Sequence, residues 1–398
     1  KNGKPGPALN RGTVITTIIF GVMVTAFVLI TSVNFGVIWA TITGLGAGVV
    51  IGITSDYFTS DDRKPVFRTA EVSHSGAAIN IITGFSYGLA SIVPSVIGIA
   101  LATLLAYYLA EINGLAGIYG IGISAVGMLS ISGMIVSADA YGPIVDNARG
   151  IAEMSGMDHH VIETTDVLDA AGNTAKAITK GFSISAAALT VLALFAAYAE
   201  VVTASGVQLN MSLREPIVVA GVFLGLMTPP LFSALTMLSV TENAFAMIEE
   251  IRRQFRDRPG ILAGTETPDY DACVDMAAKG SLSSLLWPAL IAVGLPLLIG
   301  FVLGPNALGG FLGGSIFSGV IFALFMSNAG GLWDNAKKYI EAGNFGGPGS
   351  DAHKASVVGD TVGDPFKDTA GPSLNTLITV MSLVASLFAP LIAAFHLF

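Results

Sequence analysis

The chain has 398 residues, of which 53% are hydrophobic and only 12% are charged, and its mean hydropathy is +0.71. This composition excludes an ordinary soluble domain and predicts an all-α polytopic membrane protein. A single cysteine, Cys273, excludes an internal disulfide and any cysteine-based metal site. The net charge of −9 says little about solubility, because most of the surface is expected to face lipid.

The first residues, 1–7, are polar and lack the apolar core of a signal peptide, and no initiator methionine is present. We therefore expect the chain to begin within a longer protein.

Nine apolar stretches match or exceed the roughly 20 residues that a membrane-crossing helix needs. Several are longer than a bilayer requires, so we expect them to project from it as helices. The chain is predicted to form one membrane-embedded helical domain over 1–398, with spans near 13–31, 33–54, 79–109, 115–143, 178–202, 215–248, 281–303, 308–333 and 372–397. The longer polar connections are 55–78, 144–177, 249–280 and 334–371.

The distribution of positive charge supports this count of spans. All four polar connections follow an even-numbered span, so they fall on the same side of the membrane as the N-terminal segment. Of the 19 Lys and Arg residues, only Arg214 falls on the other side. This asymmetry matches the positive-inside rule and predicts that the four connections face the cytoplasm.

Five segments on that side carry carboxylates together with Asn or Lys where the spans emerge. The first follows the second span and contains Asp56. The next contains Asp139 and Asp146, which lie two helical turns apart on one face. Segment 166–180 aligns Asp, Asn and Lys along one helical face, and segment 327–339 closes the eighth span.

The fifth segment places Asp360, Asp364 and Asp368 at intervals of four residues. A helix would stack these carboxylates on one face, about 6 Å apart. Like charges so arranged repel each other unless a cation lies against them, and carboxylate oxygens suit Mg²⁺ or Ca²⁺. Lys367 lies beside this stripe and could neutralise part of it or contact an anionic substrate. Such a pocket suits a polyanion that is held through several Mg²⁺ ions.

Alternative interpretations stay open for the individual residues. Any one acidic segment alone is more simply a solvated helix end, although five on one side weaken that interpretation. Asp139 and Glu242 look buried within their spans, and each is either a proton-carrying group or a satisfied polar contact. His159 and His160 are expected at the surface, and the basic run 252–258 is expected to meet anionic lipid.

Four motifs strongly resemble those of the membrane-integral inorganic pyrophosphatases, which are ion pumps that hydrolyse pyrophosphate. They lie at 139–148, 169–174, 333–341 and 359–375. The resemblance covers essentially the whole chain and implies the C-terminal part of a larger helical bundle. Earlier helices of the family bring a further Asp-rich metal-binding motif, which we expect in a missing N-terminal part of the same protein.

The resemblance also implies roles for individual residues. Metal ligation by carboxylates and one amide is implied for Asp146, Asn173, Asp334, Asp360, Asp364 and Asp368. Substrate binding is implied for Lys337, Lys367, Asn173 and Asp56, although the family usually has Glu at position 56. Attack by a water held between carboxylates would involve Asp146 and Asp368 as catalytic residues.

Lys176 is the most informative single residue under this resemblance. The K⁺-dependent branch of the family has Ala here and the K⁺-independent, proton-pumping branch has Lys, whose ammonium can occupy the place of the ion. No K⁺ requirement is therefore expected, and Lys176 counts among the catalytic residues. Arg149 stands where Gly is frequent, and Thr379 stands where many relatives carry a gate Lys. Ion coupling is assigned to Asp139, Glu242 and Thr379.

The leading hypothesis is Mg²⁺-dependent hydrolysis of inorganic pyrophosphate coupled to proton translocation across the lipid bilayer. A homodimer is expected in the cell membrane of a prokaryote or in an acidic-organelle membrane, with its active site facing the cytoplasm and with no nucleic-acid partner. The alternative is a secondary transporter for phosphate or another small anion, whose site would lie near the midplane of the membrane. A structural scaffold would leave the clustered acids unexplained.

Overall fold

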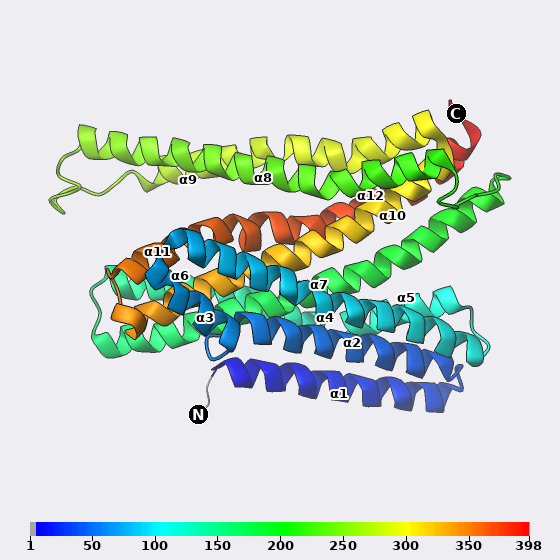
Figure 1. Ribbon diagram of the computed structural model, residues 1–398, viewed down its shortest axis with the longest axis horizontal. Coiled ribbons are helices and arrows are strands. Elements are labelled where there is room, and N and C mark those ends of the chain that lie inside the picture. Colours follow the sequence, from blue (N-terminus) through cyan, green and yellow to red (C-terminus); the bar gives the residue numbers. More distant parts are fainter. Residues whose placement is uncertain (1–4, 398) are drawn as a thin grey trace.

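The computed structural model describes residues 5–397, and every regular element within that range is helical. Long helices run side by side along the molecule (Figure 1). They are α1 (Pro5–Thr31), α2 (Gly36–Thr59), α3 (Lys64–Val72), α4 (Ala77–Ile112), α5 (Gly117–Leu129), α6 (Ser132–Met154), α7 (His159–Ala204), α8 (Pro216–Asp257), α9 (Tyr270–Ser284), α10 (Leu286–Glu341), α11 (Asp351–Pro365) and α12 (Gly371–Ala394). Short turns are η1 (Ser73–Ser75), η2 (Asn344–Gly346) and η3 (Phe366–Ala370).

The predicted all-α polytopic architecture is confirmed for the described residues, and the count of nine spans is roughly consistent with them. Seven helical stretches are long and apolar enough to cross a membrane, and the pair α5–α6, bent by 46°, adds an eighth. The ninth comes from α10, which is divided at Gly304 and turns back there (Figure 1). The φ of 82° at Gly304 is a left-handed conformation that glycine adopts readily, and Pro305 then suits the first turn of the second half.

Several helices extend well beyond the apolar stretches that predicted them. Helix α7 begins at His159, although its span was expected from 178, and α6 continues to Met154. Helix α10 likewise continues through Asp334 to Glu341. The polar connections 144–177 and 334–371 are therefore largely helical, which confirms the expected projection of the spans and places their acidic residues on rigid elements.

The second half of α10 is the central helix of the bundle. Nearly all its side chains from Gly304 to Ala336 are buried, and α4, α7, α8 and α12 pack around it. Close approach to α8 requires small residues: a Cβ added at Gly314 would lie 3.0 Å from the backbone nitrogen of Leu226. The helix that carries Asp334 is thus fixed by neighbours on several sides.

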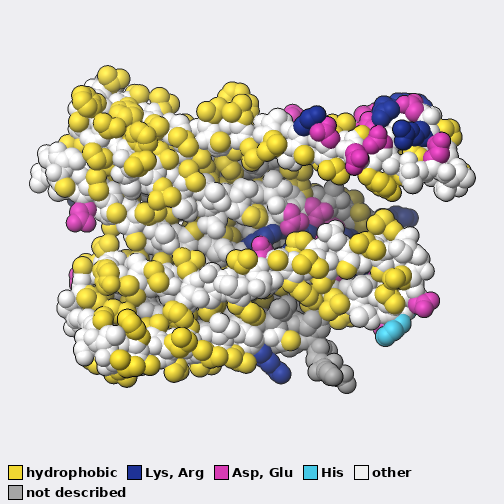
Figure 2. Space-filling view, turned by 180° about the vertical axis from the view of Figure 1, so that it is seen from behind, with side chains coloured by type: hydrophobic (Ala, Val, Ile, Leu, Met, Phe, Trp, Pro, Cys, Tyr) yellow, Lys and Arg dark blue, Asp and Glu magenta, His cyan; other side chains and the backbone are white. Residues whose placement is uncertain are grey.

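Charged side chains gather toward one end of the molecule and in a recess between two layers of helices (Figure 2). The polar connections and the start of α1 lie together at one end, while the connection between α7 and α8, which contains Arg214, lies at the other (Figure 1). The positions agree with the predicted charge asymmetry. Residues 1–4, which include two further lysines, lie outside the described residues.

Candidate active site

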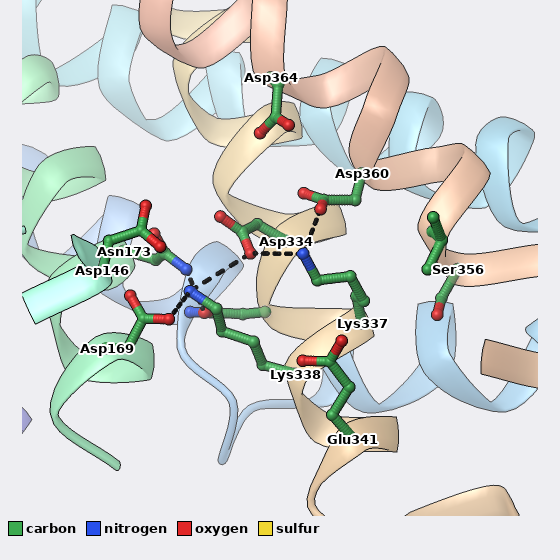
Figure 3. Close-up of polar contacts among 12 residues, drawn as sticks. Asp146, Asp169, Asn173, Asp334, Lys337, Lys338, Glu341, Ser356, Asp360 and Asp364 are labelled. Atoms are coloured by element: carbon green, nitrogen blue, oxygen red, sulfur yellow. Dashed lines mark hydrogen bonds and ion pairs between the residues drawn. The ribbon is translucent and has the colours of Figure 1, made fainter. Parts of the chain in front are cut away.

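Helices α10 and α11 bring three of the predicted metal ligands together. Asp334 lies near the end of α10, while Asp360 and Asp364 lie one turn apart on α11 (Figure 3). One carboxylate oxygen of each residue lies within 4.8 Å of the others. Asp334 and Asp360 are buried, whereas Asp364 is exposed. We call these three residues the carboxylate group.

The turn between α10 and α11 explains how two distant segments meet. It contains four glycines with positive φ, which allow the chain to reverse tightly: Gly343, Gly346, Gly347 and Gly349. Ser350 then caps α11, because its side-chain oxygen accepts a hydrogen bond from the backbone N–H of His353. Helix α11 therefore returns alongside α10 with its acidic face toward Asp334.

Two lysines balance the charge of the carboxylate group. The Lys367 Nζ lies 2.6 Å from Asp334, 2.5 Å from Asp364 and 4.0 Å from Asp360. Lys337 pairs with Asp360 and lies 3.8 Å from Asp334. The ammonium of Lys367 thus occupies the space among three carboxylates, where the sequence predicted a cation.

A third lysine extends this network to α7, and it was not among the predicted site residues. Lys338 lies 2.6 Å from Asp169 and 3.4 Å from Asp334 (Figure 3). Asp169 is buried and was also missed as a site residue. A signal for both existed in the sequence, because Lys338 follows Asp334 by one helical turn and Asp169 shares the stripe of Asn173.

The carboxylate group has the donor atoms that a divalent metal ion requires. Oδ1 of Asp334 and Oδ1 of Asp360 are buried and accept no hydrogen bond from the described residues. Two oxygens that bind one Mg²⁺ at about 2.1 Å lie at most about 4.2 Å apart. The oxygens of the group lie within 4.8 Å of one another, so an ion could bind there once the Lys367 ammonium moves out from among them.

The carboxylate group forms one wall of the site, and α6, α7, η3 and the start of α12 form a second wall. These elements line a cavity of 440 Å³ with several predicted site residues, namely Asp139, Asp146, Lys176 and Asp368, together with Lys180. Lys176 lies 3.6 Å from Asp146, and Lys180 lies 3.2 Å from Asp368. Lys180 was missed as a site residue, although it follows Lys176 by one turn.

Asp368 does not join the carboxylate group that the four-residue spacing predicted. Pro365 lacks a backbone N–H, and the chain widens directly after it into the π-helix η3, Phe366–Ala370. This wider turn directs Asp368 toward Lys180 of α7. Asp360 and Asp364 thus join Asp334, whereas Asp368 lines the cavity and still lies 3.7 Å from the Lys367 Nζ, which links the two walls.

Lys176 and Asn173 occupy buried positions on α7. The aliphatic part of Lys176 lies against α6, where a Cβ added at Gly142 would come within 2.6 Å of the lysine Cγ. Asn173 donates to Asn335 at 3.2 Å, and Asn335 donates to the Thr59 carbonyl at 2.6 Å. These contacts hold the side chains of α7 against α6, α10 and α2.

The expected burial of Asp139 and Glu242 within their spans is wrong. The Asp139 side chain is exposed because it faces the cavity, where it accepts a hydrogen bond from Thr179 at 3.2 Å. Glu242 is exposed because it lies on the outer face of α8, near exposed Leu238 and Phe245. It lines neither of the cavities described here.

Two further predicted residues lie apart from the carboxylate group. Asp56 is mostly buried and lies 3.5 Å from Arg63, at the end of α2. Thr379 is partly buried on α12 and donates to the carbonyl of Asn375 at 3.0 Å. Asn375 lines a smaller cavity of 170 Å³, which shares Asp139 and Lys180 with the larger one.

Comparison with known proteins agrees with the sequence motifs. A family described as inorganic H⁺ pyrophosphatase matches residues 1–388. A K⁺-insensitive pyrophosphate-energized proton pump of Methanosarcina mazei is 49% identical over 98% of this chain and 58% of its own length. A protein of the same name from Caldanaerobacter subterraneus is 45% identical over 97% of this chain and 57% of its own. A putative K⁺-stimulated pyrophosphate-energized sodium pump of Clostridium tetani is 47% identical over 98% of this chain and 57% of its own length. The chain thus spans somewhat more than half the length of these relatives.

Proposed function

The chain belongs to the family of inorganic H⁺ pyrophosphatases, and from that premise we propose that it binds Mg²⁺ and pyrophosphate in a pump that couples hydrolysis to proton transport. The observation that carries the proposal is the carboxylate group, held within 4.8 Å and surrounded by lysines. A site of acids alone would repel pyrophosphate. Acids that bind metal, placed beside lysines that bind phosphate, are suited to a metal–phosphate complex.

Each wall of the site has its own part in this proposal. Asp334, Asp360 and Asp364 hold the metal, and Lys337 and Lys367 donate charge-assisted hydrogen bonds to phosphate oxygens. These contacts are strong because both lysines are largely shielded from water, with side chains 20% and 6% exposed. Magnesium, when bound, supplies positive charge that stabilises the departing phosphate.

The opposite wall is suited to hold the attacking water. Asp146 and Asp368 have side chains that are 54% and 47% exposed, and both line the cavity of 440 Å³. A carboxylate there can orient a water molecule and accept its proton during attack on phosphorus. The neighbouring Lys176 and Lys180 fix the positions of these two carboxylates by pairing with them.

We further propose that hydrolysis needs no K⁺. The names of the relatives leave this open, because both K⁺-insensitive and K⁺-stimulated pumps are between 45% and 49% identical to the chain. Lys176 supports K⁺ independence: it is buried, and its ammonium lies 3.6 Å from Asp146, where a monovalent ion would otherwise balance the charge. Dimeric assembly and a cytoplasmic orientation of the charged end belong to the same proposal.

Phosphate release tests this function directly. The full-length protein would be placed in vesicles with Mg²⁺ and pyrophosphate but without K⁺ or Na⁺, while phosphate and lumenal pH are followed. Release with acidification is the expected result. Release without acidification would retain the hydrolase and overturn proton coupling. Absence of release with every cation, together with uptake of labelled phosphate, would favour the transporter instead.

A further inference from the structure

Arg149 lies on α6 one turn beyond Asp146 and contacts carboxylates with each nitrogen of its guanidinium. Its Nε donates to Asp166 at 2.9 Å, its Nη1 donates to Glu153 at 2.5 Å, and its Nη2 lies 3.6 Å from Glu341. The three acids belong to α7, α6 and α10. A single side chain therefore joins three of the helices that form the site.

The same network reaches α11 through Glu341. The second carboxylate oxygen of Glu341 lies 3.0 Å from Nε2 of His353, the third residue of α11. The backbone N–H of Gly349 donates to Nδ1 of that ring at 3.0 Å, so Nδ1 is the acceptor and Nε2 carries the hydrogen. His353 thus donates to Glu341, and the chain of contacts runs from α6 through α10 to α11.

These four helices carry candidate ligands from both walls of the site. Asp146 is on α6, Asn173 is on α7, Asp334 is on α10 and Asp360 is on α11. The contacts of Arg149 involve none of these ligands, and Arg149 lines neither cavity. Its influence on the site passes through the placement of the helices and through Glu341, whose charge also acts on Lys337.

Resting on the proposed function, we propose that Arg149 is a positioning residue that sets the distance between the two walls and hence the affinity for Mg²⁺-pyrophosphate. Its side chain is only 22% exposed, so its three contacts are less screened than those of surface pairs. The planar fork of a guanidinium can contact several acids at once in fixed directions. An ammonium at this position would keep the charge but not the geometry.

The test measures affinity separately from catalysis and stability. The full-length protein and its variants R149Q, R149K and E341Q would be assayed for phosphate release over a range of Mg²⁺-pyrophosphate concentrations. We expect KM to rise about tenfold in R149Q and E341Q, and kcat to fall as well, because displacement of the helices also moves the carboxylates that hold the attacking water. R149K should recover part of the loss, and the double variant R149Q/E341Q should be no worse than R149Q, since the two residues act together.

A control and a second readout keep the outcomes distinct. R252Q removes an exposed arginine of α8 that, among the described residues, pairs with Glu249 alone, and it should leave KM unchanged. The concentration of Mg²⁺-methylenediphosphonate that half-maximally raises the melting temperature should also increase about tenfold in R149Q. If this half-maximal concentration is the same for R149Q and wild type, the positioning role would be overturned, even if R149Q has a lower melting temperature than wild type. If the wild-type protein is stabilised by this ligand but releases no phosphate, only the proposed function is overturned. If the wild-type protein is not stabilised by the ligand and releases no phosphate, both proposals are overturned.

Discussion

The two walls of the site use the same residue types but are packed differently. On one wall, α10 and α11 bury Asp334 and Asp360 among lysines. On the other, α6 and η3 leave Asp146 and Asp368 about half exposed to a cavity. The acids of both walls pair with lysines within the chain, but those of the open wall are also exposed to whatever enters the cavity.

This difference indicates that packing, more than residue type, decides what each carboxylate can do. A buried acid that loses its partner leaves an uncompensated charge in a medium of low dielectric constant, so each member of that wall depends on the others. An exposed acid is partly compensated by water and can change partners at small cost. The buried wall is suited to hold a ligand in fixed geometry, and the open wall is suited to act on it.

The largest expected effect comes from removing a charge from the buried wall. D334N leaves Lys338 and Lys367 without their shared carboxylate, and we expect a loss of about 3–5 kcal/mol in the free energy of unfolding, with loss of phosphate release. D364N makes the same chemical change at an exposed member of the group and should cost about 1 kcal/mol or less. Denaturation in detergent would compare them. Equal losses would contradict the distinction between the two degrees of burial.

A smaller effect is expected when the ammonium within the carboxylate group is removed. Lys367 lies where a metal ion would bind, so K367M should lower stability without Mg²⁺ by about 2–3 kcal/mol. Added Mg²⁺ should restore much of this loss, because the ion replaces the missing positive charge. Melting curves over a Mg²⁺ titration measure this, with K354M, an exposed lysine of α11, as the control. A K367M protein that does not respond to Mg²⁺ would argue against a metal site in this group.

Replacement of Lys176 tests the open wall. K176A removes the cation beside Asp146, and phosphate release without K⁺ should fall about tenfold, which corresponds to about 1.4 kcal/mol in the activation free energy. Added K⁺ should restore most of the activity if the ion can occupy the vacated place. An enzyme assay with and without K⁺, in otherwise identical buffer, is sufficient. If the activity of K176A is the same with and without K⁺, Lys176 does not replace the ion.

The smallest expected effect comes from displacing Lys176 without removing it. G142A places a methyl group within 2.6 Å of the lysine Cγ, so the side chain must shift. We expect phosphate release to fall about threefold, less than in K176A because the positive charge stays near the cavity. G133A is a matched control on the same helix, since its added Cβ meets no atom within 4 Å. Equal activities of the two variants would show that the site tolerates movement of Lys176.

Much of the architecture could be predicted from the sequence. Spans and their extensions followed from the lengths of apolar stretches, and the clustering of polar segments at one end followed from the positions of Lys and Arg. The break in α10 was also anticipated, because a hydrophobic region from 281 to 333 is too long for one crossing. Only the conformation of Gly304 revealed how the turn is made.

The site was predicted less completely. Asp360 and Asp364 meet Asp334 as the motifs suggested, but Asp368 lies outside this group and pairs with Lys180 as well as with Lys367, and helical spacing alone did not indicate the π-helix. Lys338 and Asp169 pair across α10 and α7, a contact between residues far apart in the chain. Asp139 and Glu242 lie on helices whose apolar composition suggested burial, yet Asp139 faces the cavity and Glu242 lies on the outer face of α8.

The amino-acid sequence was sufficient to predict the long apolar helices, the clustering of polar segments at one end and the residues that carry the family's motifs. These properties depend on hydrophobic length, charge and residue order, all of which are local. The packing of the helices was needed to learn which carboxylates share a lysine, which are buried, and that Arg149 joins three helices of the site. Those properties depend on how each helix is rotated and where its neighbours pack, and a rotation of one residue position, about 100° in an α-helix, is enough to move a side chain from one wall to the other.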